Sequence, residues 1–157
     1  MTTTNPLTLL MQTPLPSKNQ QRKLKFRPTK VQIKEVYALL NEHVFEGKLT
    51  QPSINLRSME FLGLCTGYDD PDHHVKIRLT NGFFCIQWFI IILAHEMAHQ
   101  YQWVIHGPRR VSEKRKPLLS HGGSFFEFKS KMAEFGIPLK SEYHTEKWIK
   151  HQSLNKL

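Results

Sequence analysis

Apolar residues at helical spacing first appear after residue 28. Residues 1–28 are rich in Thr, Pro, Asn, Gln and Lys and show no sustained periodicity, so we expect a flexible arm with little order there. Thr29 and Gln32 form a capping-box pattern, and the apolar residues that follow repeat at helical spacing as far as Val44. This pattern predicts a helix that begins at Thr29 and ends before Gly47.

Two stretches with β-branched and apolar residues follow the breaker Pro52. Residues 53–68 and 74–80 contain short runs that are typical of strands, and the polar sequence DDPDHH is typical of a turn between them. These runs predict a small antiparallel sheet of about three strands.

The longest apolar run of the chain belongs to a predicted buried helix. Residues 84–105 contain neither Gly nor Pro, and their length favours a helix over a strand. Gly107-Pro108 is expected to end it. The most apolar part, residues 83–94, is too short to span a bilayer, so we expect no association with a membrane.

A third helix is predicted between residues 124 and 136. Ser124 and Glu127 form a second capping-box pattern, and Gly136 is expected to end the helix. Tyr143 and Trp148 are candidates for a short docked helix in the tail. The chain is therefore divided into the arm at 1–28, an α+β domain at 29–139 and a C-terminal extension at 140–157.

The buried helix contains the sequence His95-Glu96-Met97-Ala98-His99. Residues four apart on a helix differ by about 40° of rotation and about 6 Å of rise, so both imidazoles can reach one ion. Zinc prefers nitrogen ligands in tetrahedral geometry, and Glu96 lies beside them, where its carboxylate can take a proton from water without binding the metal. The pattern predicts a catalytic zinc site with one ion per chain.

A catalytic zinc site usually has three protein ligands, and four residues are candidates for the third. His106 would lie about 10.5 Å further along a continuing helix, so a capping or solvent-facing role is favoured for it. His121 follows a long loop and precedes two glycines that allow close backbone approach, which suits a ligand. Glu127 and Glu134 are the remaining alternatives, as third ligand or as partners of the ligands.

These motifs resemble the SprT-like zinc metalloproteases, which include the DNA-dependent protease Spartan. The resemblance covers residues 31–136 and rests on four features: the segment from Asn41 to Leu49, similar to the family's N-x-x-x-F-x-G-x-L; a strand at 75–79; the H-E-M-x-H helix; and His121-Gly122-x-x-Phe125. It implies a zincin-like metalloprotease domain with His121 as the third zinc ligand and Glu96 as the catalytic base.

The sequence also departs from the family pattern. Gly123-Ser124 stands where the family often has Pro and Glu, and the loop between His99 and His121 is longer than usual. The C-terminal cysteine zinc ribbon that many members carry is not visible in this chain. The basic N-terminal arm is the candidate to replace it in substrate targeting.

Charge and cysteine content add an expectation about partners and location. The formal net charge is +9, and no acidic residue precedes Glu35. Cys65 and Cys85 form no C-x-x-C pair, and the N-terminus lacks a secretory pattern, so we expect a cytoplasmic or nucleoid- or nuclear-associated protein that is not secreted. The candidate DNA contacts are cations of the arm and of the loop before His121: Arg22, Lys23, Lys25, Arg27, Arg109, Arg110, Lys114, Arg115 and Lys116.

Three functions are compatible with these features. The favoured one is a zinc-dependent endopeptidase that hydrolyses proteins bound or crosslinked to DNA, in which zinc polarises the peptide carbonyl and Glu96 transfers the proton. The alternatives are a DNA-binding module with a structural zinc site and little protease activity, and an ordinary peptidase with no nucleic-acid role. The sequence does not predict an oligomeric state.

Overall fold

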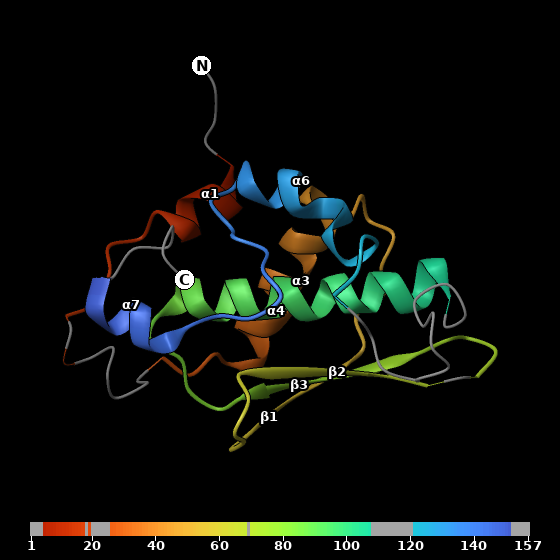
Figure 1. The fold of residues 1–157 in the computed structure, drawn as a ribbon, viewed down its shortest axis with the longest axis horizontal. Helices are drawn as coiled ribbons and strands as arrows, with labels where there is room; N and C mark the ends of the chain where they lie inside the picture. Colours follow the sequence, from red (N-terminus) through yellow and green to blue (C-terminus); the bar gives the residue numbers. More distant parts are fainter. Residues whose placement is uncertain (1–4, 18, 20–25, 69, 108–120, 152–157) are drawn as a thin grey trace.

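The computed structural model describes residues 5–17, 19, 26–68, 70–107 and 121–151. The described chain is an α+β structure in which a three-stranded sheet lies beneath a long helix, with the other helices on the same side of the sheet (Figure 1). The elements in chain order are α1 (Pro6–Met11), α3 (Lys30–His43), β1 (Ser53–Arg57), β2 (Gly63–Gly67), β3 (Val75–Thr80), α4 (Ile86–Tyr101), the π-helical turn η1 (Gln102–His106), the 3₁₀ turn η2 (Phe125–Phe128), α6 (Lys129–Ala133) and α7 (Thr145–His151).

The sheet is mixed, which corrects the prediction of an antiparallel sheet. Its strand order is β1-β3-β2; β2 pairs antiparallel with β3, as the predicted turn requires, but β1 pairs parallel with β3. Residues 58–62 join β1 to β2 across the end of β3, a gap of two strand spacings or about 9.5 Å. Strand patterns predict neither pairing partners nor direction, so this crossover was not foreseeable.

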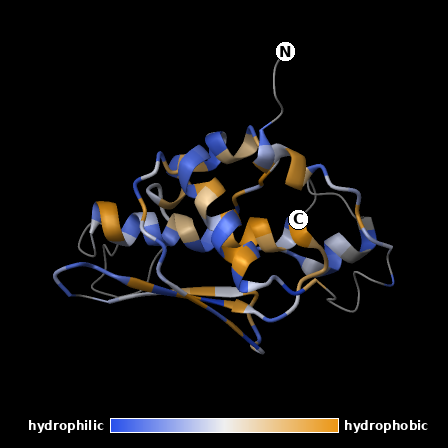
Figure 2. Cartoon of the chain, turned by 180° about the vertical axis from the view of Figure 1, so that it is seen from behind, coloured by the Kyte–Doolittle hydropathy of each residue, from blue (hydrophilic) through white to orange (hydrophobic). Residues whose placement is uncertain are grey.

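The alternation of residues in β3 explains how the sheet packs. Val75, Ile77 and Leu79 are buried and face α4, whereas Lys76 is exposed on the outer face. Figure 2 shows apolar stretches within the strands and a hydrophilic turn between β2 and β3. The inner face of the sheet therefore contributes to the core, and β2 is an edge strand.

Helix α3 has the predicted start and end signals. The Thr29 side chain accepts a hydrogen bond from Gln32 N, and the Gln32 side chain accepts one from Thr29 N, so the capping box is confirmed. Beyond the helix, Gly47 has φ of +70°, and its N–H donates to Asn41 O. The Asn41 side chain bonds both the N–H and the carbonyl of Leu49, which holds the turn closed.

Helix α4 is the centre of the core. Every residue of it from Gln87 to Tyr101 is buried, because the helix lies between the sheet and the other helices (Figure 1). The long apolar run without Gly or Pro therefore corresponds to a helix that is surrounded on all sides. Among the described residues, no helix is both long and apolar enough to cross a membrane.

The arm contains a helix, which corrects the expectation of little order before Thr29. The Asn5 side chain caps α1 by accepting a hydrogen bond from Leu7 N at 2.8 Å. Leu7 and Met11, four residues apart, are buried in the core. Further along, Phe26 forms an antiparallel bridge with Phe83. The core thus extends into the arm at these positions.

The third predicted helix is divided and has a different start. It consists of η2 followed by α6, and Ser124 makes no capping hydrogen bond. The Ser124 hydroxyl instead accepts from the Gln102 side chain at 2.9 Å, and Glu127 lies 2.9 Å from His106 Nε2. The predicted capping box is wrong because tertiary partners bind both side chains.

Candidate metal centre

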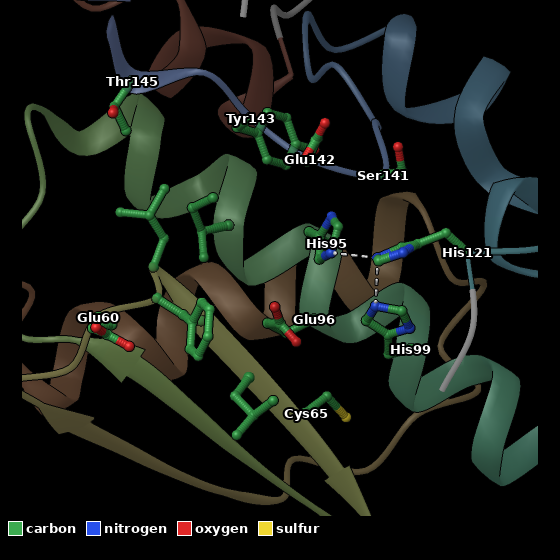
Figure 3. Close-up of a pocket in the computed structure, with 15 residues that line it drawn as sticks. Glu60, Cys65, His95, Glu96, His99, His121, Ser141, Glu142, Tyr143 and Thr145 are labelled. Atoms are coloured by element: carbon green, nitrogen blue, oxygen red, sulfur yellow. Dashed lines mark hydrogen bonds between the residues drawn. The ribbon is translucent and has the colours of Figure 1, made fainter. Parts of the chain in front are cut away.

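Three histidine side chains meet at one point beside α4. His95 and His99 are buried on consecutive turns of the helix, and His121 reaches them from the residues just before η2 (Figure 3). Nε2 of His121 lies 3.2 Å from Nε2 of His99 and 3.3 Å from Nε2 of His95. One ligand atom from each residue lies within 4.8 Å of the others, so the three can hold a metal ion.

Two of the three separations match the geometry of zinc. Two nitrogens bound to one tetrahedral zinc ion, each at about 2.05 Å, lie about 3.3 Å apart. The two short separations, 3.2 and 3.3 Å, are of this size. Imidazole nitrogens also suit copper, iron and nickel, so the donor set fits zinc without excluding other transition metals.

The surroundings of His99 determine its tautomer. Nδ1 of His99 lies 2.9 Å from Gln102 Oε1, an oxygen that only accepts, so Nδ1 carries the proton. The Gln102 amide in turn donates to the Ser124 hydroxyl. Nε2 of His99 therefore presents its lone pair to the other histidines, which is the form that binds a metal.

Phe125 forms an apolar platform under the cluster. Its ring is fully buried, and its centroid lies 4.8 Å from that of His95, 4.5 Å from that of His99 and 4.8 Å from that of His121. In the sequence, Phe125 stands out only as the last residue of the motif His121-Gly122-x-x-Phe125. Its spacing of four from His121 was the available signal, but its packing against the two helix histidines depends on the tertiary fold.

The apolar surroundings keep the histidines neutral. The pKa of His95 is lowered to about 3, chiefly by burial and also by the neighbouring His99 and His121, against an opposing effect of the Lys140 backbone. Burial likewise lowers the pKa of His99 to about 4 against the opposing effect of Gln102, and it lowers the pKa of His121. Neutral imidazoles are the metal-binding form.

Glu96 lies between α4 and the edge strand β2, and its side chain enters the same cleft (Figure 3). Burial raises the pKa of Glu96 to about 8, opposed by a hydrogen bond with the Cys65 backbone. Gly63 makes this close approach possible, because a Cβ there would lie 3.0 Å from Glu96 Oε1 and 2.9 Å from the Ile92 side chain. Cys65 and Cys85 are both free thiols.

The cleft has a volume of about 500 Å³. One wall is β2 with the preceding turn, the floor is α4, and the opposite wall is the segment after Pro138 (Figure 3). This second wall was not predicted from the sequence. Its residues that line the cleft are Ser141, Glu142, Tyr143 and Thr145.

The other candidate ligands lie elsewhere. Glu127 is paired with His106 at 2.9 Å, and Glu134 with Lys131 at 3.1 Å. Among the described residues, the cluster of possible metal ligands contains only the three histidines. The structure thus brings His121, and neither glutamate, next to His95 and His99, while its role as a metal ligand stays a prediction.

The candidate DNA contacts are mostly outside the described residues. Arg27 is exposed. The remaining eight predicted cations fall in parts of the chain that the structure does not describe: Arg22, Lys23, Lys25, Arg109, Arg110, Lys114, Arg115 and Lys116.

Comparison with known proteins adds no family assignment. No protein-family model matches the chain, and no curated protein sequence matches it.

Proposed function

We propose that this protein is a zinc-dependent endopeptidase that acts on protein substrates, in particular proteins associated with or crosslinked to DNA. The observation that carries the proposal is the convergence of His95, His99 and His121 at separations that suit zinc, in an open cleft that also contains the buried carboxyl group of Glu96. The resemblance of the same motifs to SprT-like metalloproteases supports the substrate class.

Glu96 is the proposed proton-transfer group. A zinc ion held by the three histidines would supply a Lewis acid for the peptide carbonyl and would acidify a water molecule. In its carboxylate form Glu96 would accept a proton from the attacking water, and the resulting carboxylic acid would donate it to the leaving amine. Burial raises the pKa of Glu96 to about 8, close enough to neutral pH for the group to take both forms. The Cys65 backbone holds the carboxyl group in place.

The edge strand β2 is the proposed binding surface for the substrate backbone. It pairs only with β3 among the described strands and lines the cleft beside Glu96. An extended peptide can add to such an edge through main-chain hydrogen bonds. Phe61 and Leu64, which are exposed at this wall, offer apolar surfaces for its side chains.

A DNA-binding module with a structural zinc site is the second candidate, and its support is the net charge of +9. Structural zinc sites usually have four protein ligands. The cluster here has three, and it opens into a cleft beside a carboxyl group. These features favour the enzyme.

Substitution of Glu96 tests the proposal. Glu96→Gln is expected to retain about one zinc per chain, because Glu96 is not a ligand, and to lose proteolysis by about 10²–10⁴-fold, the usual contribution of a positioned acid–base group. Zinc content is measured by atomic absorption, and cleavage of a basic DNA-binding protein is followed with and without DNA. Wild-type protein that binds zinc but cleaves nothing would favour the binding module instead.

A further inference from the structure

The segment after Pro138 packs directly on the face of α4 that carries the metal site. Trp148 is fully buried, and its ring meets that of Trp88 edge to face at 5.7 Å. Trp88 and His95 are seven residues apart, so they lie on the same face of α4, about 10.5 Å apart along the axis. The segment after Pro138 therefore packs along the same face of α4 as His95, a candidate zinc ligand.

The Tyr143 ring packs against both Trp88 and His95 on this face of α4. Its ring centroid lies 6.2 Å from that of Trp88 and 5.5 Å from that of His95, edge to face in both cases. Figure 3 shows Tyr143 above His95, on the side of the cleft opposite β2. The His95 ring is thus enclosed by Tyr143 and Phe125, the latter at 4.8 Å.

The hydroxyl group of Tyr143 closes the turn that precedes it. It donates to Pro138 O at 2.7 Å and accepts from Lys140 N at 3.2 Å. The turn brings the Lys140 backbone close to the His95 ring. Because the Tyr143 hydroxyl is bonded to the backbone in this way, its role is structural support of the site and not proton transfer.

We propose that the C-terminal segment from Pro138 to Trp148 is part of the metal centre and that Tyr143 is a positioning residue for His95. This inference rests on the proposed zinc site. Tyr143 and the turn it closes fix the orientation of the His95 imidazole, and Trp148 anchors the segment to α4. Groups that orient a metal ligand typically contribute about 10–100-fold to metal affinity.

The test compares zinc affinity in full-length variants, measured by competition with a chromophoric chelator. Tyr143→Phe keeps the ring but removes both hydroxyl hydrogen bonds, and it is expected to raise the zinc Kd by about 10-fold, with Tyr143→Leu raising it further. Tyr37→Phe is the matched control, because Tyr37 is a buried tyrosine whose hydroxyl donates to Gln100 at 2.8 Å, away from the cleft. It is expected to lower Tm without changing the Kd.

A second pair of variants tests the anchor. Trp148→Leu and Phe84→Leu each remove a ring that meets Trp88 edge to face, at 5.7 and 5.5 Å respectively, but only Trp148 belongs to the tail. Trp148→Leu is expected to weaken zinc binding and to shift the visible absorption of the Co²⁺-substituted protein, which reports ligand geometry. Phe84→Leu is expected to leave the spectrum unchanged.

The outcomes separate this inference from the proposed function. Wild-type zinc affinity in Tyr143→Phe, Tyr143→Leu and Trp148→Leu, with only Tm reduced, would overturn the role of the tail and leave the zinc protease intact. A wild-type protein that binds no zinc would overturn the proposed function, and this inference with it.

Discussion

The three histidines differ in how firmly their surroundings hold them. His99 donates to Gln102, and His95 is enclosed between Tyr143 and Phe125. His121 is exposed, and its ring packs against those of Phe125, His99 and His95. Because a ligand from a separate segment must be positioned by the fold, the completeness of the site depends on His121 more than on the helix pair.

Loss of His121 should therefore abolish tight zinc binding. His121→Ala leaves two protein ligands, and we expect its zinc Kd to rise by more than the roughly 100-fold upper range for loss of a supporting residue. His106→Ala is the control, since His106 pairs with Glu127 outside the cluster. Chelator competition measures both variants. A large effect of His106→Ala with none for His121→Ala would mean that the ligand set is wrong.

At the scale of elements, β2 approaches its neighbours closely through two glycines: Gly63 faces α4, and Gly67 faces η1. A Cβ at Gly63 would meet the Ile92 side chain at 2.9 Å and the end of the Glu96 side chain at 3.0 Å, whereas a Cβ at Gly67 would meet the Trp103 ring at 2.4 Å. The Glu96 carboxyl group lines the cleft, so added bulk at Gly63 can displace it from its hydrogen bond with the Cys65 backbone. The Trp103 indole is buried and donates to Tyr68 O, so it cannot yield easily.

Alanine substitutions at the two glycines of β2 should consequently affect different properties: the one at Gly63 mainly activity, and the one at Gly67 mainly stability. Gly63→Ala is expected to displace Glu96 and to lower kcat/KM by about 100-fold, the cost of a misplaced catalytic group, while zinc content stays near one per chain. Gly67→Ala is expected to destabilise the fold by about 1–3 kcal/mol through overpacking. Thermal unfolding and peptidase assays on both variants distinguish the cases, and equal loss of stability would contradict the assignment for Gly63.

At the scale of the whole molecule, both ends of the described chain join one core around α4. Leu7 of α1 and Trp148 of α7 are fully buried, so the core includes residues outside the predicted domain at 29–139. The charge of +9 belongs to the whole chain, and it favours sequence-independent binding to polyanions.

If the positive charge of the chain binds the DNA that carries the proposed protein substrates, DNA binding should weaken steeply as the salt concentration rises. Substituting Arg109, Arg110 and Lys114 by Gln is expected to reduce the magnitude of the slope of log K against log salt by about 3, because each cation that neutralises a phosphate contributes about 0.9 to it. Filter binding to duplex DNA across a salt series measures the slope.

A control with the same change in charge uses the outer face of the sheet. Arg57, Lys76 and Arg78 project from β1 and β3 on the face opposite α4, away from the cleft. Substituting these three by Gln should leave most of the slope unchanged. Equal slopes for the two triple variants would mean that net charge alone attracts DNA, and an absence of salt-dependent retention in wild type would favour an ordinary peptidase.

Local signals in the sequence were sufficient for several features. The spacing of His95 and His99 follows from helix geometry alone, and the capping box at Thr29 needs only neighbours three residues apart. A similar signal for α1 was present in Asn5, Pro6 and the spacing of Leu7 and Met11, but a helix of six residues is too short for periodicity to stand out.

Features that join distant segments were decided by the tertiary structure. His121 was a candidate among four until the fold brought its ring to His95, which lies 26 residues earlier. Local patterns indicated none of three further features. These are the parallel direction of β1, the tertiary partners of Ser124 and Glu127 that replace a helix cap, and the packing of Tyr143 on His95. Helical spacing is a property of a few consecutive residues, whereas strand pairing and cleft walls depend on which surfaces the whole chain buries together.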